Sequence, residues 1–382
     1  MYSNKVTDRS VTYNTNYMKI LLIGEYSRAH LTLAEGLRSL GHEVLTASDG
    51  DGFKNYPRDV DLSRKSSGII DTFTSLMSVL SKFRKFKGYD IVQLINPCFT
   101  TQNVRVNNYL YKKLKKNNKK VFMGAFGDDS YWVSACLGNK IFDYSEFFVD
   151  GKAINVDFNQ RFIDKWIGTP LEAFNRGLAK DVDGITACLY EYYKAYEPFF
   201  PDKLRYIPLP MNIAEIEFQP IPEEPEKVNF FIGINKVREK FKGTDVMEKA
   251  LARIKDKYPD KVIVTRVESV SYDVYQQLMS QAHVVLDQLY SHTPAMNALL
   301  AMAQGKVVVG GGEPYIYDLY GDTSNQPIVN VHPHEDDVFD KLEWLVLNKK
   351  DIPEISKKSR QFVETNHDYV TVAKKYLDFW RL

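Results

Sequence analysis

The chain of 382 residues contains only three cysteines, Cys98, Cys136 and Cys188. Their odd number and wide spacing exclude a disulfide framework and match no zinc-binding pattern, which indicates a reducing compartment. No apolar run reaches the roughly 20 residues that a membrane-spanning helix needs. Residues 1–17 are polar and lack the apolar centre of a signal peptide. We therefore expect a cytoplasmic protein that begins with a disordered extension over residues 1–17.

The sequence also lacks a strong excess of either charge. Its formal net charge is +1, which argues against nucleic acid as the main partner. The charges are unevenly divided, however. Residues 1–205 contain 29 Lys and Arg against 23 Asp and Glu, whereas residues 206–382 contain 21 against 26. A basic first half and an acidic second half predict different substrates or partners for the two halves.

Two nucleotide-binding signatures are absent as well. The sequence has no Gly-x-Gly-x-x-Gly motif and no P-loop, which argues against a nicotinamide-dependent dehydrogenase. It also has no internal repeat and no low-complexity tract. The chain is 44% hydrophobic and 26% charged, a composition typical of a globular protein, and its length suits two domains.

The sequence has instead a regular alternation of short apolar runs and amphipathic segments. Runs such as Lys19–Gly24 (KILLIG) are typical of buried parallel strands, and Leu31–Leu40 has the apolar spacing of a helix. The first half predicts strands at 19–24, 44–47, 90–95, 121–125, 184–188 and 205–207, and helices at 31–40, 69–86 and 104–117.

A proline-rich, acidic segment at 208–228 interrupts this alternation, which then resumes. This order predicts an α/β fold with two Rossmann-like domains, residues 18–207 and 229–369, facing a central cleft. Segment 208–228 would be the linker, and a last helix at 370–382 would pack back on the N-terminal domain. The second half predicts strands at 229–234, 262–267, 284–286 and 307–309, and helices at 244–258, 271–282, 295–304 and 352–366.

Three segments carry a family resemblance: residues 19–44 (KILLIGEYSRAHLTLAEGLRSLGHEV), 234–245 (INKVREKFKGTD) and 287–312 (DQLYSHTPAMNALLAMAQGKVVVGGG). In these segments the chain resembles GT-B glycosyltransferases, in the large family 4-like group that uses nucleotide-sugar donors. The resemblance implies transfer of a sugar from a nucleotide-sugar to a glycan or lipid-linked acceptor. It also implies that neither a metal ion nor another cofactor takes part.

The resemblance implies a donor site in the second half of the chain. A leaving nucleoside diphosphate gains negative charge, so without a metal it needs cations and N–H donors. Lys242 would supply a cation, and the helix expected at 295–304 would supply free N–H groups, with Thr293 as its N-cap and Pro294 in its first turn. The implied donor-binding residues are Gly24, Lys236, Arg238, Lys242, Gly243, His292, Thr293, Met296, Asn297 and Glu313.

The sequence departs from the family at two of these positions. Where the family has two glutamates around the donor helix, this chain has His292 and Leu300. Leucine cannot bind the ribose hydroxyls, so we expect Glu313 to supply a carboxylate instead. The departure leaves three functions open: a sugar-transferring enzyme, a catalytically silent nucleotide-sugar-binding protein, and a nucleotide-sugar epimerase.

Candidate catalytic residues lie in the first half. Asp128 and Asp129 follow a predicted strand, so either could act as a general base near the acceptor hydroxyl, or the pair could simply cap a helix. His30 follows the first strand and could line the same cleft or be a buried or solvent-facing histidine. We expect His332, His334 and His367 to be surface residues.

Two basic stretches, Lys82–Lys87 (KFRKFK) and Lys112–Lys120 (KKLKKNNKK), remain. Each could be a solvated helix end. Alternatively, the two phenylalanines of the first stretch could lie in a lipid interface while the cations contact anionic headgroups. The second interpretation predicts peripheral contact with the inner membrane face.

Overall fold

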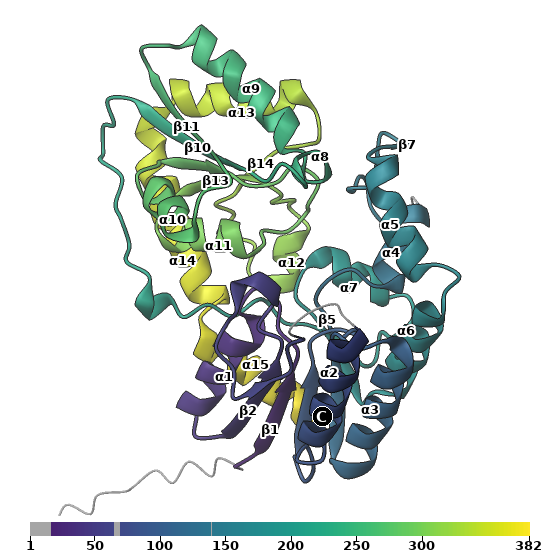
Figure 1. Ribbon diagram of the computed structural model, residues 1–382. Helices are drawn as coiled ribbons and strands as arrows, with labels where there is room; N and C mark the ends of the chain where they lie inside the picture. The colour runs from purple at the N-terminus through teal and green to yellow at the C-terminus, as the bar shows by residue number, and fades with distance from the viewer. Residues whose placement is uncertain (1–16, 65–68, 139) are drawn as a thin grey trace, which may run out of the picture.

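The computed structural model describes residues 17–64, 69–138 and 140–382. The disordered extension predicted for residues 1–17 therefore lies outside the described residues, except for Tyr17. The chain forms two parallel α/β sheets of seven and five strands (Figure 1), which confirms the predicted fold class. In the described residues no helix is long and apolar enough to cross a bilayer.

The N-terminal sheet has the strand order β3-β2-β1-β4-β5-β8-β9, and every pairing in it is parallel. Its central strands are short apolar runs buried on both faces, as parallel sheets require. The strands are β1 (Lys19–Ile23), β2 (Glu43–Ser48), β3 (Val60–Asp61), β4 (Ile91–Leu94), β5 (Lys120–Ala125), β8 (Gly184–Ala187) and β9 (Leu204–Tyr206).

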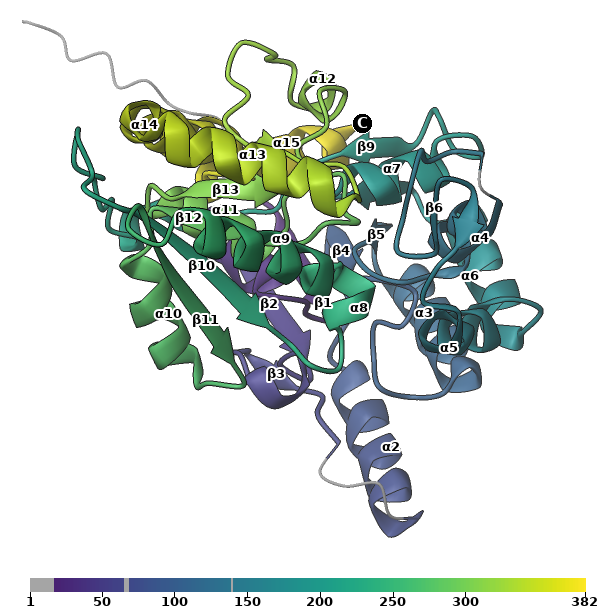
Figure 2. The ribbon, with the colours of Figure 1, turned by 90° about the horizontal axis from the view of Figure 1, so that it is seen from above.

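Helices cover both faces of this sheet, and Figure 2 shows α2 projecting from the domain. The helices predicted in the first half are present, but the sequence did not predict those between β5 and β9. The helices are α1 (Ala29–Ser39), α2 (Ile69–Phe83), α3 (Val104–Asn117), α4 (Ser130–Gly138), α5 (Val156–Trp166), α6 (Pro170–Asp181) and α7 (Tyr190–Tyr196), with a short 3-10 turn η1 (Gly52–Lys54) and a hairpin of β6 (Phe148–Val149) and β7 (Lys152–Ala153).

The C-terminal sheet has the order β11-β10-β12-β13-β14 and is also parallel. Its strands are β10 (Val228–Ile234), β11 (Val262–Glu268), β12 (Val284–Leu286), β13 (Val307–Gly310) and β14 (Val329–Asn330). Its helices are α8 (Glu239–Lys242), α9 (Thr244–Lys257), α10 (Tyr272–Ser280), α11 (Met296–Ala303), α12 (Ile316–Tyr320), α13 (Glu335–Leu347) and α14 (Ile352–Asn366), with 3-10 turns η2 (Ile213–Glu215) and η3 (Lys349–Asp351).

The chain crosses between the two sheets twice, and the crossings pair with each other. The Met211 N–H donates to the His367 carbonyl at 2.7 Å, and the Tyr369 N–H donates to the Met211 carbonyl at 3.0 Å. His367 is buried, with Nδ1 2.8 Å from the Leu209 carbonyl. The prediction that His367 lies on the surface was therefore wrong, because this residue sits where the crossings meet.

After the second crossing, α15 (Tyr369–Arg381) returns to the N-terminal domain and packs against α1 (Figure 1). The approach is so close that a Cβ added at Gly36 of α1 would lie 2.4 Å from the Tyr369 carbonyl oxygen. Lys120 donates to the Trp380 carbonyl at 3.0 Å, which ties the end of α15 to β5. The last helix is thus a structural part of the N-terminal domain.

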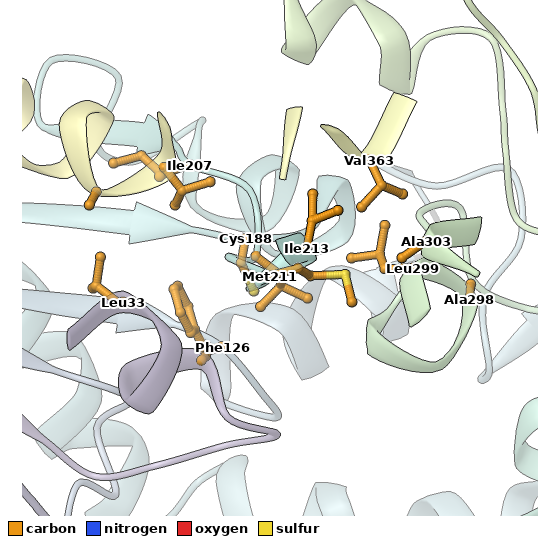
Figure 3. Close-up of a cluster of buried hydrophobic side chains, with 14 of the residues drawn as sticks. Leu33, Phe126, Cys188, Ile207, Met211, Ile213, Ala298, Leu299, Ala303 and Val363 are labelled. Atoms are coloured by element: carbon orange, nitrogen blue, oxygen red, sulfur yellow. The ribbon is translucent and has the colours of Figure 1, made fainter. Parts of the chain in front are cut away.

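One apolar cluster runs through the crossings from one domain to the other (Figure 3). It begins at Leu33 and Phe126, continues through Met211 of the linker, and reaches Leu299 and Val363 beside the second sheet. The two domains are therefore joined by a continuous apolar core.

Candidate functional site

The loops at the carboxyl ends of the strands of both sheets meet in the cleft, where parallel α/β sheets bind ligands. On the C-terminal side these loops follow β10, β12 and β13. On the N-terminal side they follow β1, β5 and β8. Direct contacts join the two sets, as the hydrogen bond from the Tyr190 N–H, after β8, to the Thr293 hydroxyl, after β12, at 3.0 Å shows.

The N-terminus of α11 faces the loop after β12 without a side-chain cap. The helix begins at Met296 and its N-cap is Ala295, which makes no side-chain capping bond. The prediction of Thr293 as N-cap was wrong, because the Thr293 hydroxyl donates instead to Glu191 Oε2 at 2.8 Å. Pro294 accordingly precedes the helix. The N–H groups of the first turn, at Met296 and Asn297, thus remain available to an anion.

Lys242 lies beside this helix end. The Leu289 N–H donates to the Lys242 carbonyl at 2.8 Å, which ties α8 to the loop after β12. In that loop Asp287 accepts a hydrogen bond from Asn297 Nδ2 at 2.8 Å. Burial lowers the pKa of the Lys242 ammonium, and the charge of Asp287 partly opposes this effect. Among the described residues, no carboxylate oxygen lies within 4.0 Å of the ammonium.

Two glycines allow these loops to approach each other. Gly243 has φ 70°, and a Cβ there would lie 2.7 Å from the Leu289 Cβ. A Cβ at Gly311, just after β13, would lie only 1.8 Å from the Ser291 carbonyl oxygen. Gly243 and Gly311 therefore allow the three loops after β10, β12 and β13 to lie in contact.

The other two predicted cations lie farther out. Arg238 is exposed, and its guanidinium carbon lies 5.2 Å from the centre of the Phe241 ring. Lys236 is also exposed and forms ion pairs with Glu239 at 3.5 Å and Glu268 at 3.6 Å. Arg238 is still close enough for its positive charge to lower the pKa of Lys242. Lys236 is instead directed toward the two carboxylates.

His292 is buried with both ring nitrogens occupied. Its Nε2 lies 2.8 Å from the Tyr144 carbonyl oxygen, which can only accept, so Nε2 donates and Nδ1 accepts from the Tyr315 hydroxyl at 2.5 Å. The ring also stacks on Tyr144 at 4.3 Å. Leu300 packs against the apolar cluster, and Glu313 binds the Tyr144 hydroxyl and lies 3.4 Å from His332 Nδ1.

The two candidate aspartates of the N-terminal domain, Asp128 and Asp129, have structural partners. Asp129 is fully buried, and its Oδ1 accepts from the Tyr131 and Trp132 N–H groups while Oδ2 accepts from the Tyr196 hydroxyl at 2.6 Å. Asp129 therefore caps α4, as the alternative interpretation predicted. Burial raises its pKa to about 6. Asp128 is partly exposed, and its Oδ2 accepts from Lys165 and the Trp166 indole, both at 2.7 Å.

His30 is buried in the first turn of α1. Its Nδ1 donates to the Gly24 carbonyl at 2.8 Å, and its Nε2 is buried without a partner among the described residues. Burial lowers the pKa of His30 to about 4. Gly24 itself has φ 86°, and a Cβ there would lie 2.1 Å from Ile95 Cγ2. Both residues lie at the carboxyl end of β1, but His30 is beneath the cleft surface.

The sequence analysis did not identify three residues of the N-terminal domain that lie against the loops of the C-terminal domain. Glu191 follows β8 and contacts residues 291–293, Tyr144 contacts His292 and Glu313, and Glu146 lies opposite α8. Asn155 Nδ2 donates to the carbonyls of both Glu146 and Lys240, which places Glu146 beside α8. Glu191 could have been found from its place after a predicted strand, but nothing in the sequence marks Tyr144 or Glu146.

The basic stretches lie at the amino ends of the central strands of the N-terminal sheet, where α2 and α3 lead into β4 and β5. Asn118 Nδ2 donates to the Phe86 carbonyl at 3.2 Å, so the stretches adjoin. Phe83 and Phe86 are buried in the core, which contradicts the expectation that they lie in a lipid interface. Several cations also have internal partners: Lys82 (Asp61 carbonyl), Lys115 (Asp183), Lys119 (Asp90) and Lys120 (Trp380 carbonyl).

No family model and no curated protein sequence matches the chain. Solved structures do match over nearly its full length. Sucrose-phosphate synthase from Thermosynechococcus elongatus has a TM-score of 0.60 at 12% identity, covering 95% of this chain and 98% of that one. HepE from Anabaena in complex with UDP-glucose gives 0.59 at 13%, covering 95% and 99%. WaaG, a glycosyltransferase involved in lipopolysaccharide biosynthesis, gives 0.58 at 13%, covering 94% and 98%. These likenesses establish the GT-B fold.

Proposed function

We propose that the protein is a glycosyltransferase that moves a sugar from a nucleotide-sugar to a glycan or lipid-linked acceptor without a metal ion. The observation that supports this most directly is the uncapped N-terminus of α11 beside Lys242. Helix N–H groups and a partly desolvated ammonium together stabilise a diphosphate as its charge develops. Arg238 would add a second cation at the rim.

The test is a thermal-shift screen across nucleoside diphosphates and their sugars. UDP and UDP-glucose come first, because the structurally similar HepE was solved with UDP-glucose. We expect one nucleotide to raise the melting temperature, and Lys242→Ala to abolish the shift. Lys240→Ala is the matched control, since Lys240 is an exposed cation on the same short helix. No shift with any nucleotide, or an equal loss in both variants, would refute the donor site.

The acceptor side supports a reaction that depends mainly on leaving-group stabilisation. Asp129 is committed to the cap of α4, and His30 is buried. Asp128 alone has an oxygen, Oδ1, that accepts no hydrogen bond from the described residues. In this proposal Asp128 orients Lys165 and Trp166, and the departing diphosphate assists removal of the acceptor proton.

A second function deserves a direct test, namely nucleotide-sugar binding without turnover. The specific observation in its favour concerns the two positions at which the family has glutamates. Both ring nitrogens of His292 are hydrogen-bonded, to Tyr144 and Tyr315, and Leu300 packs against the apolar cluster. Neither residue therefore supplies a carboxylate to the donor. Tight binding of a nucleotide-sugar with no transfer, no hydrolysis and no epimerisation across a full acceptor panel would establish this function.

We also propose that the protein works in the cytoplasm and contacts the inner membrane face through the exposed cations of Lys82–Lys87 and Lys112–Lys120. Because these lie at the amino ends of β4 and β5, away from the loops at the carboxyl ends, they would anchor the protein rather than deliver the acceptor. Flotation with anionic vesicles tests this: binding should be lost at high salt. Absence of binding even at low salt would refute the contact.

A further inference from the structure

Glu191, in the first turn of α7, extends its carboxylate across the cleft into the C-terminal domain. The side chain is buried, with 7% of its surface exposed. Its Oε1 accepts from the Ser291 hydroxyl at 2.8 Å, the His292 N–H at 2.5 Å and the Thr293 N–H at 3.1 Å. Its Oε2 accepts from the Thr293 hydroxyl at 2.8 Å.

All four of these donors belong to the loop between β12 and α11. Two consecutive backbone N–H groups with a hydroxyl on each side form a concave anion site. The adjacent Tyr190 N–H donates to the same Thr293 hydroxyl at 3.0 Å, which adds a second bond across the cleft. Among the described residues no cation forms an ion pair with Glu191. The carboxylate is therefore stabilised by hydrogen bonds from the opposite domain.

An acidic residue in the first turn of a helix usually stabilises that helix. Glu191 can act on α7 through its charge, but within the described residues no N–H group of α7 donates to its carboxylate. Its partners are 100 to 102 residues away in the sequence. A role within α7 therefore does not explain why all the hydrogen bonds to the carboxylate come from the other domain.

The loop that Glu191 binds leads directly into the donor site. Residues 291–293 precede Ala295, and the uncapped first turn of α11 follows at Met296 and Asn297. Gly311 packs against the Ser291 carbonyl on the other side. The conformation of this loop thus sets the direction of the N–H groups that would bind the diphosphate.

We propose that Glu191 is a positioning residue that couples closure of the two domains to donor binding. When the domains close, its carboxylate fills the anion site of residues 291–293 and fixes the loop. When they open, the four donors lose their acceptor and the loop is free to move. By linkage, a donor that binds the fixed loop favours the closed state by the same factor. This inference rests on the proposed nucleotide-sugar site.

The experiment compares Glu191→Gln and Glu191→Ala with the wild type and with Glu197→Gln. Glu197 ends the same helix and pairs with Lys194, away from the loop, so it is a matched control. Circular dichroism checks folding, and Glu191→Gln keeps the volume and one acceptor oxygen if the alanine variant fails to fold. Small-angle scattering of the unliganded proteins reports domain opening, and calorimetry reports the affinity for the nucleoside diphosphate found in the screen.

We expect a larger radius of gyration and about tenfold weaker diphosphate binding for Glu191→Gln, with a stronger effect for Glu191→Ala, because bonds to a charged acceptor are lost. The KM for the donor should rise in parallel. Wild-type scattering together with wild-type affinity in the alanine variant would overturn the proposal. If the wild type binds no nucleotide, the proposed function fails, whereas scattering still decides whether Glu191 closes the cleft.

Discussion

The two walls of the cleft are built from equivalent loops but satisfy their polar groups differently. On the acceptor side, Asp129 accepts three hydrogen bonds and Asp128 accepts two. On the donor side, α11 begins without a cap and Lys242 has no carboxylate within ion-pair distance in the described residues.

This difference separates residues that stabilise the fold from residues available to a ligand. A buried polar group without a partner costs free energy, so a protein keeps one where a ligand completes it. Lys242 and the first turn of α11 lack a carboxylate and a side-chain cap, whereas Asp129 caps a helix and Asp128 forms an ion pair. Among the candidate residues on the N-terminal wall, the buried atom that has no partner in the described part of the chain is His30 Nε2 rather than an aspartate oxygen. Residue type alone cannot reveal this, since both walls carry charged residues after a strand.

The largest destabilisation is expected from a substitution at Gly311, where the loops after β12 and β13 touch. Gly311→Ala would place a Cβ 1.8 Å from the Ser291 carbonyl oxygen, and we expect it to lower the free energy of unfolding by about 3 kcal/mol. Gly177→Ala is the control. It lies in α6 with open space around it and should raise stability by about 0.5–1 kcal/mol. Urea denaturation measures both, and equal effects would contradict the described packing.

On the acceptor side, Asp129→Ala should lower the free energy of unfolding by about 2 kcal/mol, because the α4 cap and the Tyr196 bond are lost. The kcat of the folded fraction should stay within about tenfold of the wild type, as should that of Asp128→Asn. Removing a true general base would lower kcat by about a hundredfold or more without unfolding the protein. Such a loss in either variant would reverse the contrast between the walls.

Glu146 is an exception on the N-terminal wall, because among the described residues no other side chain donates a hydrogen bond to its carboxyl group. Burial raises its pKa from 4.5 to about 8. The folded protein then holds a proton that the unfolded chain releases, so stability is lost as pH rises from about 4.5 to about 8. Glu146→Gln should therefore melt at a higher temperature than the wild type at pH 8, with the gap closing near pH 4.

Glu172 provides the opposite sign as a control. The Gly168 N–H and Arg176 lower its pKa, so its contribution is present above its unfolded pKa and lost as pH falls through the folded one. Glu172→Gln should melt below the wild type at pH 8. If both variants shift the melting temperature in the same direction at pH 8, the pKa assigned to Glu146 is wrong.

Much of the fold could be predicted because hydrophobic periodicity is local. Strand β12 and helices α3 and α14 have the predicted bounds, and the other predicted elements differ by one to three residues. Among the helices between β5 and β8, only α4 lacks a periodic pattern, because it is buried on most sides and has no polar stripe. Helices α5 and α6 are amphipathic, and α6 also has Thr169 as its N-cap and Pro170 in its first turn, so these two could have been predicted from local signals.

Parts of the candidate site could be predicted where their residues lie in one continuous segment of the sequence. The Lys242-Gly243 segment and the helix after β12 were found because each is continuous in the sequence. Glu191, Tyr144 and Glu146 act across the cleft, and their roles depend on which loop the other domain presents. The choice between cap and base at Asp129 likewise depended on Tyr196, 67 residues away.

The return of α15 to the N-terminal domain bears on the order in which the chain folds during synthesis. Domains usually fold from the N-terminus as they leave the ribosome. Here the surface of α1 around Gly36 lacks its packing partner until Tyr369 has been made. Lys120 of β5 likewise lacks its acceptor until Trp380 has been made. The first domain therefore completes its packing only after α15 has emerged, when the second domain has already been made. A nascent chain stalled before α15 would contain the whole second domain, while its first domain would still lack the helix that packs against α1.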